Sequence, residues 1–293
     1  MQLVQVLISG LLIGGIYALI SMGLNLILGV VRIINFAHGE FLMIAMYMSF
    51  VFYSTFGLDP YVSAPLVTIL LFLFGMAIQR VMIQPILDQP ATVKIFATLG
   101  LSIALQNFAL MMWKADFRNV QTAYQTDVIR LGEVVISIPR LVAFAVAILI
   151  ALGLFWFLKR TMTGKAIRAV AMGRTAAALM GINVKRIYLL AFGIGSALVG
   201  LAGSILMPIF YVFPTVGTLF SLTAFVVVVL GGMGSMSGAF LGGLLIGLVE
   251  AFAGVLISPE LKEAVYFSIF ILVLLFRPSG LFSLGKGSEE VGL

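Results

Sequence analysis

The sequence predicts an all-α polytopic membrane protein with about eight or nine transmembrane helices, since each span of a bilayer needs roughly 20 apolar residues. Of its 293 residues, 62% are hydrophobic and only 10% are charged, and the mean hydropathy is +1.21. Soluble domains carry charge on about a quarter of their residues. The apolar runs are continuous rather than alternating, which favours helices over a β-barrel. We therefore expect one membrane domain spanning residues 1–293.

Apolar runs that are long enough to form spans recur along the whole chain. They lie near residues 4–30, 37–56, 61–84, 92–113, 139–158 and 187–211, before a broken region at 219–257 and a last short span at 262–276. Aromatic residues that favour the membrane interface end several of these runs: Tyr53, Tyr61, Trp113 and Tyr211. No basic residue precedes the first run, so we expect a retained span rather than a cleaved signal peptide.

The distribution of basic residues predicts the orientation of the chain. Seven of the 17 Lys and Arg residues lie within 159–186, with no acidic residue among them. The 114–138 loop instead mixes three basic with three acidic residues. Cytoplasmic loops are enriched in Lys and Arg. We therefore expect 159–186 inside, 114–138 outside, the N-terminus outside and the C-terminus cytoplasmic.

This orientation requires residues 219–257 to begin and end outside. The middle of the region reads "LGGMGSMSGAFLGG" and contains Gly231, Gly232 and Gly234 after a short apolar run. Short apolar segments interrupted by glycine mark the substrate sites of membrane carriers. The pattern favours a broken or re-entrant helix that contributes to a translocation path or gate. The alternative is a plain cytoplasmic turn between two ordinary spans.

Small residues recur at helical spacing in three of the spans. They form the series Gly10, Gly14 and Ala18; Ala191, Gly195, Val199 and Gly203; and Ala239, Gly243, Gly247 and Ala251. Such stripes let helices approach closely in a bilayer, so we expect them to be packing seams.

The basic loop contains the stretch "GKAIRAVAMGRTAAALMGI", residues 164–182. Ala169, Gly173, Ala177 and Gly181 are spaced by four, which predicts one smooth face on a short cytoplasmic helix. A ridge of small side chains fits a groove on another protein. The alternative is a basic helix on anionic headgroups, although such a helix needs bulky apolar anchors rather than glycines.

His38, the only histidine, and Glu40 stand at the start of the second span, within "INFAHGEFLMIAMY". Two interpretations stay open. In the first, Asn35 caps the helix, and Glu40 lies near the inner interface, about 7–8 Å along the axis. There the helix N-terminus and Arg32 would stabilise the carboxylate. In the second, Asn35, His38 and Glu40 line a gate or translocation path.

Four separated motifs together resemble the first permease subunit of ABC importers for branched-chain amino acids. They are "INFAHGEFLMIAMY", "RAVAMGRTAAALMGINVKR", "VVVVLGGMGSMSGAFLGGLLIGLVE" and "LLFRPSGLF", and the resemblance covers nearly the whole chain. It implies that 164–182 is the coupling helix that docks on an ATPase. The residues assigned to this helix are Gly164, Arg168, Ala169, Gly173, Ala176, Ala177 and Gly181. Thr175 stands where such permeases often carry an acid, so a salt bridge to the ATPase is not implied.

The resemblance also implies a function and its partners. The chain would carry leucine, isoleucine and valine across a bacterial inner membrane with ATP hydrolysed by two cytoplasmic ABC ATPase subunits. A sister permease and an extracytoplasmic solute-binding protein would complete the importer. Related permeases carry urea, short amides or other amino acids, so these substrates stay open. No cofactor and no nucleic-acid partner are expected.

Other features of the residues agree with a transport subunit rather than an enzyme. Lys159 stands where the first glycine of G-x-x-x-x-G-K-[ST] would precede Gly164, so the chain has no P-loop. Cysteine is absent, which excludes disulfides and thiolate metal sites. An ion-coupled secondary carrier would use membrane carboxylates such as Glu40 and Glu250, which are too sparse for a convincing ion path.

An intramembrane serine protease is the third class of protein to consider. Ser235 or Ser237 would need a base, and His38, the sole histidine, belongs to a distant segment with no matching motif. The carrier also leaves the smooth face of 164–182 unexplained.

Overall fold

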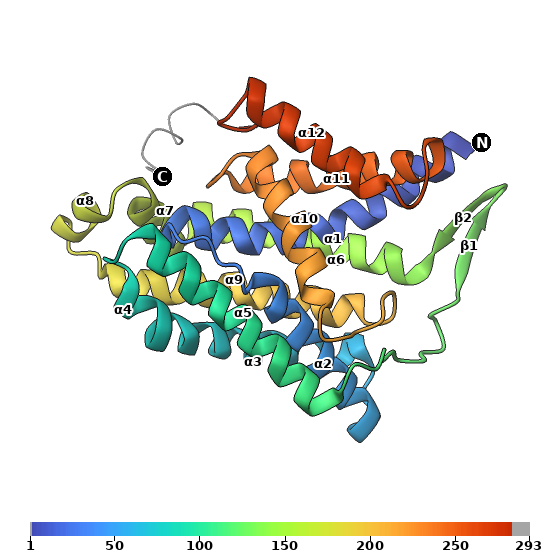
Figure 1. Ribbon diagram of the computed structural model, residues 1–293, viewed down its shortest axis with the longest axis horizontal. Coiled ribbons are helices and arrows are strands. Elements are labelled where there is room, and N and C mark those ends of the chain that lie inside the picture. The colour runs from blue at the N-terminus through green and yellow to red at the C-terminus, as the bar shows by residue number, and fades with distance from the viewer. Residues whose placement is uncertain (1, 283–293) are drawn as a thin grey trace.

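The computed structural model describes residues 2–282 and consists mainly of helices (Figure 1). In chain order these are α1 (Gln2–Val31), α2 (His38–Phe56), α3 (Pro60–Ile78), the π-helical turn η1 (Gln79–Ile83), α4 (Gln84–Ile86), α5 (Ala91–Trp113), α6 (Ile138–Arg160), α7 (Met162–Met172), α8 (Arg174–Leu179), α9 (Val184–Leu206), α10 (Val216–Gly231), α11 (Met236–Leu256) and α12 (Lys262–Phe276). Two antiparallel strands, β1 (Val128–Leu131) and β2 (Val134–Ser137), form a hairpin in which Val128 pairs with Ser137.

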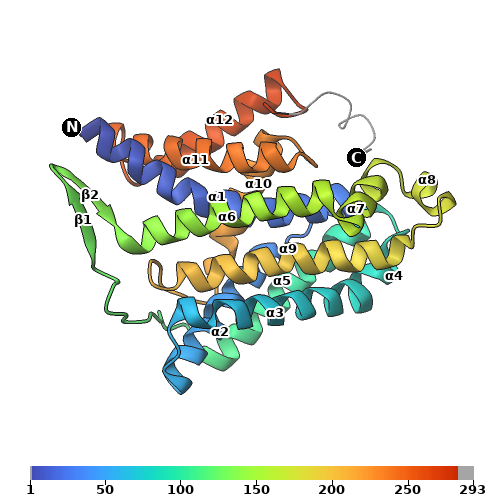
Figure 2. The same cartoon turned by 180° about the vertical axis from the view of Figure 1, so that it is seen from behind.

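Within residues 2–282, seven helices are long and apolar enough to cross a membrane, and α10 is a shorter apolar helix. The expected all-α polytopic fold is confirmed, and the chain is a multi-pass membrane protein. The α7–α8 segment lies at one end of the bundle and the β1–β2 hairpin at the other (Figure 2). We call these the α8 end and the hairpin end.

The stripes of small residues are packing seams, as their spacing predicts. A Cβ added at Gly14 of α1 would lie 2.8 Å from Leu244 Cα of α11, so these two backbones touch. A Cβ at Gly195 of α9 would lie 2.7 Å from the carbonyl oxygen of Gly23 in α1. Close backbone contact is how helices associate in lipid. The seams therefore hold α9 and α11 directly against α1.

Local signals explain where several helices begin, end and bulge. Asp59 caps α3 by accepting from the Tyr61 N–H at 2.8 Å, and Gly57 ends α2 with φ of 67°. Both are ordinary choices, since a carboxylate satisfies free N–H groups and glycine tolerates the left-handed region. Pro85 has no N–H for the preceding turn. Directly before it, the helix widens to π spacing, with Gln84 N donating to the Gln79 carbonyl.

The loop before the hairpin is tied to the α2–α3 turn. The Tyr124 hydroxyl donates to both oxygens of Asp59, each at 2.8 Å, and its ring stacks on Tyr61 with centroids 5.0 Å apart. Burial, together with the Asp59 carboxylate, raises the pKa of Tyr124. The hydroxyl therefore stays protonated and keeps its donor role over the physiological pH range.

The glycine-rich break at 219–257 is present as a tight turn between two separate helices, α10 and α11. Gly232 and Gly234 adopt φ of 104° and 83°, which favours glycine. The Asn25 side chain of α1 clamps this turn, because its Nδ2 donates to the Ser235 carbonyl and its Oδ1 accepts from the Gly234 N–H, both at 2.7 Å. Gly234 therefore lies against the last turns of α1, while Gly231 packs on Gly238 of α11.

Candidate functional site

Glu40, in the first turn of α2, lies in a polar cluster contributed by three helices. Its Oε1 accepts from Gln106 Nε2 at 2.8 Å and from Ser102 Oγ at 3.2 Å, both on α5, and from Thr218 Oγ1 of α10 at 3.5 Å. The residue is only 1% exposed. Within the described residues, its Oε2 has no hydrogen-bond partner. A buried carboxylate with a free acceptor atom is costly, which is typical of a functional position rather than a structural one.

The backbones of α2 and α10 cross in direct contact beside Glu40. The Gly39 N–H donates to Ser221 Oγ at 2.8 Å. A Cβ added at Gly217 would lie 2.6 Å from the Gly39 carbonyl oxygen and would overlap Glu40 Oε2. Glycine is therefore needed on both helices for the carboxylate to reach its place between them.

The depth of Glu40 corrects one of the two interpretations drawn from the sequence. Residues 32–37 turn the chain back along α1, so that α2 begins beside its middle. His38 Nε2 lies 3.0 Å from the carbonyl oxygen of Ile20. Arg32 instead donates to the Ala171 carbonyl of α7 at 3.2 Å. The placement of Glu40 near the inner interface with Arg32 as its partner is wrong, because the segment before α2 enters the bundle.

Asn35 and His38 are fully buried next to this cluster but make different contacts. Asn35 Oδ1 accepts from the Ala37 N–H at 3.1 Å, which closes a local turn before α2. No side chain caps α2 itself. His38 contacts α1 rather than the partners of Glu40. The structure thus brings Asn35, His38 and Glu40 together and places the Gly231–Gly234 turn in a separate position near the end of α1.

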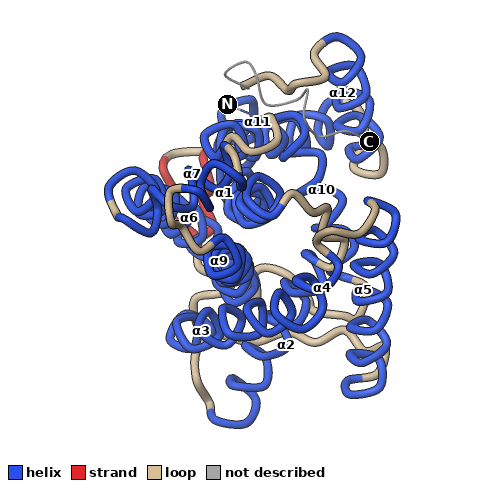
Figure 3. Tube along the Cα trace, turned by 90° about the vertical axis from the view of Figure 1, so that its left-hand side faces the viewer, coloured by secondary structure: helices blue, strands red, loops and turns tan. Residues whose placement is uncertain are grey.

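Of the three helices that form the Glu40 cluster, α5 is the most loosely packed. It lies at the margin of the bundle (Figure 3), and its buried residues are Thr98, Ser102 and Ala109. Thr98 Oγ1 donates to the Ile34 carbonyl at 3.1 Å, and Trp113 stacks on Tyr47 of α2 at 4.3 Å. The apolar residues on its other face are exposed. Since few apolar side chains interdigitate here, polar bonds carry much of the attachment of α5.

The 164–182 segment corrects the expectation of a single smooth helix. Gly173 is extended, with φ of −172°, and separates α7 from α8. The proposed ridge is therefore interrupted. Ala177 is 4% exposed and faces the protein, and Gly164 packs against Leu158, whose Cα would lie 2.6 Å from an added Cβ. Arg168 and Ala169 are on α7, Ala176 is exposed on α8, and Gly181 has φ of 82°.

Three large apolar side chains protrude at this end of the molecule, and the residues assigned to the coupling helix from the sequence do not include them. Leu179 is 84% exposed, Met180 83% and Met172 84%. We call this group the α8 tip. The letters "ALM" directly after Ala177 carried the signal, because two large apolar residues close a small-residue helix in a basic loop. An exposed apolar group of this kind, rimmed by polar residues, marks a surface that binds a protein or a membrane.

The chain matches a family described as the branched-chain amino acid transport system permease component over residues 6–274. It is 36% identical to the high-affinity branched-chain amino acid transport system permease protein BraD of Pseudomonas aeruginosa, covering 98% of this chain and 97% of BraD. It is 33% identical to LivH of Escherichia coli K12, covering 98% of this chain and 96% of LivH.

A probable branched-chain amino acid permease of Methanocaldococcus jannaschii is 26% identical, over 84% of this chain and 80% of its own length. No solved structure matches this chain. A family match over nearly the full length agrees with the multi-pass helical bundle. The chain therefore belongs to the family of branched-chain amino acid transport system permeases.

Proposed function

We propose that this chain is one permease subunit of an ATP-driven importer for branched-chain amino acids. The observation that carries the proposal is the similarity, over almost the whole chain, to permeases named for high-affinity branched-chain amino acid transport. The importer would also contain two ABC ATPase subunits, a sister permease and a solute-binding protein. The exposed α8 tip supports the ATPase contact, because its apolar side chains have no role inside the bundle.

Within this importer, the Glu40 cluster forms part of the gate of the translocation path. Glu40 is held by hydrogen bonds that tie α2 to α5 and α10. Opening the path requires α5 to move away from α10, and breaking a few polar bonds costs less than separating an interdigitated apolar face. Substrate groups replace the lost bonds as they pass.

Uptake of radiolabelled leucine by right-side-out membrane vesicles tests the proposed function. The vesicles carry the complete importer, with ATP trapped inside and the solute-binding protein added outside. We expect uptake to depend on ATP and to be competed by isoleucine and valine more strongly than by urea or acetamide. Stronger competition by urea would reassign the substrate class within the same transporter type.

The Glu40→Gln variant should reduce leucine uptake by about three- to tenfold, since one altered charge-assisted hydrogen bond corresponds to about 1 kcal/mol. Uptake by both the wild type and the variant should survive collapse of the proton gradient at constant ATP. The matched control is Asn107→Ala on the exposed side of α5, which should keep uptake near the wild-type value. Uptake that vanished with the gradient would make Glu40 a coupling carboxylate and the protein a secondary carrier.

Orientation is tested by single-cysteine labelling, for which a chain without cysteine is already suitable. We propose that the hairpin end is external and the α8 end is cytoplasmic. A membrane-impermeant maleimide should label Gln125→Cys in intact cells and Arg174→Cys only after permeabilisation. Labelling of Arg174→Cys in intact cells would invert the orientation and remove the ATPase contact from the α8 tip.

A further inference from the structure

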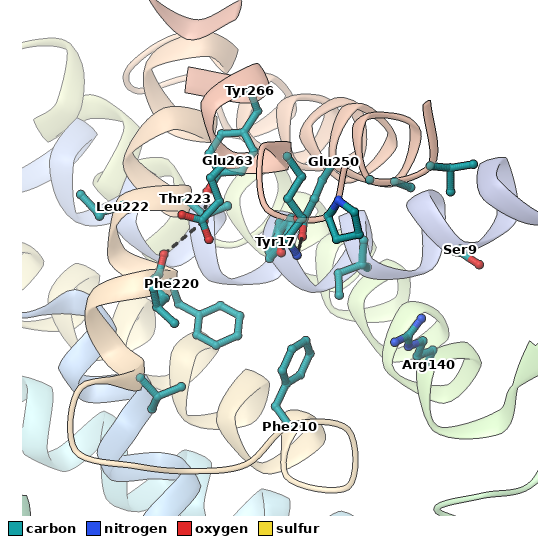
Figure 4. A pocket seen from close by; sticks show the side chains of 18 of the residues that line it. Ser9, Tyr17, Arg140, Phe210, Phe220, Leu222, Thr223, Glu250, Glu263 and Tyr266 are labelled. Atoms are coloured by element: carbon teal, nitrogen blue, oxygen red, sulfur yellow. Dashed lines mark hydrogen bonds and ion pairs between the residues drawn. The ribbon is translucent and has the colours of Figure 1, made fainter. Parts of the chain in front are cut away.

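A cavity of about 620 Å³ lies toward the hairpin end (Figure 4), and the first turns of α10 separate it from the Glu40 cluster. It is enclosed by the N-terminal half of α1, the first turns of α10, the C-terminal end of α11 and the start of α12. Sites of about 300–1,000 Å³ hold small molecules in proteins. The cavity is thus large enough for a free amino acid.

One wall of the cavity carries a charged group that the gate does not use. Glu250 of α11 accepts from Tyr17 of α1 through Oε2 at 2.6 Å and from Lys262 of α12 through Oε1 at 2.5 Å. The Glu250 side chain is 12% exposed and that of Lys262 is 39% exposed. Arg140 and Glu263 also line the cavity. Both signs of charge therefore face the same small volume.

The opposite wall is apolar and aromatic. Phe210 and Phe220 pack edge to face with ring centroids 5.7 Å apart, and Phe213 is a further aromatic residue of the lining. Figure 4 shows Phe210 and Phe220 on the side facing Tyr17 and Glu250. Aromatic rings bury aliphatic groups well and leave little room for ordered water. The cavity therefore has one charged side and one side suited to a branched hydrocarbon.

We propose that this cavity binds the free zwitterion of an aliphatic amino acid on its way from the solute-binding protein to the gate. The ammonium group of the ligand would lie at Glu250, its carboxylate at Lys262, and its side chain against the phenylalanines. Glu250 has lone pairs beyond the two in use, and Lys262 has two further N–H donors. A zwitterion leaves the cluster around the Glu250–Lys262 ion pair neutral, whereas a ligand with a single charge gives this partly buried cluster a net charge. This assignment rests on the proposed function.

Protection of a cysteine from labelling tests the site without transport. Leu219 lines the cavity and is 50% exposed, so Leu219→Cys introduces a reactive thiol at its rim. The assembled importer is used in vesicles without ATP and without the solute-binding protein. L-leucine should slow maleimide labelling about tenfold at about ten times its Kd, because labelling follows the fraction of empty sites. Val128→Cys, on the exposed hairpin, should label at an unchanged rate and is the matched control.

Two analogues of leucine test whether the site needs both charged groups of the ligand, without altering the protein. 4-Methylpentanoate lacks the ammonium group and 3-methylbutylamine lacks the carboxylate, while both keep the branched side chain. Neither should protect Leu219→Cys at concentrations where leucine does. Equal protection by either analogue would show that the cavity recognises only the hydrocarbon part of its ligand and would equally bind a lipid chain. That result would overturn the zwitterion assignment.

Variants of the pair give the second test. Glu250→Gln or Lys262→Met should abolish protection by leucine, while Lys262→Arg should restore part of it. The rate of labelling without ligand shows whether each variant keeps the cavity open. Leucine is added up to about 50 mM, which is enough to detect a millimolar Kd. If the wild-type importer takes up leucine but the amino acid does not protect Leu219→Cys at this concentration, this inference fails and the proposed function stands. Protection without ATP-driven uptake would instead overturn the proposed function.

Discussion

Replacing Gly39 with valine should abolish transport and sharply lower the amount of folded protein in the membrane. A Cβ at Gly39 would overlap the carbonyl oxygen of Gly217 and the Oγ of Ser221. The first of these is backbone and cannot rotate away, so α2 and α10 would have to separate. Overpacking of a tight contact costs about 1–3 kcal/mol, and we expect at least the top of that range here because two backbones collide.

The measurements for Gly39→Val are the membrane level of the chain, its thermal unfolding midpoint in detergent, and leucine uptake. The matched control is Gly153→Val in α6, where an added Cβ has no neighbour within 4 Å. Both variants place the same β-branched residue on a helix. Gly153→Val should therefore stay near the wild type in all three measurements. Wild-type uptake by Gly39→Val would mean that α2 and α10 do not cross as described.

The spans and packing seams could be predicted from the sequence because both depend on local pattern. Continuous apolar runs select membrane helices. The four-residue spacing of small residues around Gly14 in α1, and separately around Gly243 in α11, places them on one face of each helix. The apolar run at 262–276 forms a helix with the same bounds, α12 (Lys262–Phe276), but α12 is not among the seven helices of residues 2–282 that are long enough to cross a membrane. What the pattern could not show is that the α1 and α11 stripes face each other, since that depends on the tertiary arrangement.

The surroundings of Glu40 were out of reach for a different reason. Its partners on α5 and α10 are distant in the chain, and no periodicity links them. Residues 32–37 read as an ordinary loop, so an interfacial start of α2 was the natural expectation. Irregular backbone inside a bundle is tolerated only where protein surrounds it. Asn35 and His38 are buried in this segment and form the local contacts that its irregular backbone requires.

The 164–182 segment shows the limit of periodicity in a short helix. Spacing of four predicted one continuous face through Gly173, but most of the stability of a helix in a protein comes from tertiary packing rather than from local pattern. The helix is interrupted at Gly173, because glycine has a low helix propensity and the interruption costs little free energy there. Ala177 then faces inward, and the protruding surface passes to Leu179 and Met180. A bulky substitution of Ala177 therefore tests folding as well as docking.

Replacing Leu179 with glutamate should abolish leucine uptake while leaving the level of the chain in the membrane unchanged. Leu179 is 84% exposed, so its substitution should change the free energy of unfolding by no more than about 0.5 kcal/mol. If the α8 tip seats in an ATPase groove, a buried carboxylate there costs more than about 2 kcal/mol of binding. That weakens docking by roughly 30-fold or more, since 1.4 kcal/mol is tenfold.

The decisive comparison separates docking from folding through three variants. Met162→Glu is the matched control, because Met162 is 81% exposed and is the first residue of α7, at the opposite end of that helix from Met172 of the α8 tip. It should retain uptake and copurify with the ATPase subunits. Leu179→Glu should reach the membrane normally but lose both copurification and the stimulation of ATP hydrolysis by the loaded binding protein. Ala177→Trp should lower the membrane level as well, because its side chain is buried. Full uptake by Leu179→Glu, with Met162→Glu impaired instead, would move the coupling surface away from the α8 tip to the start of α7.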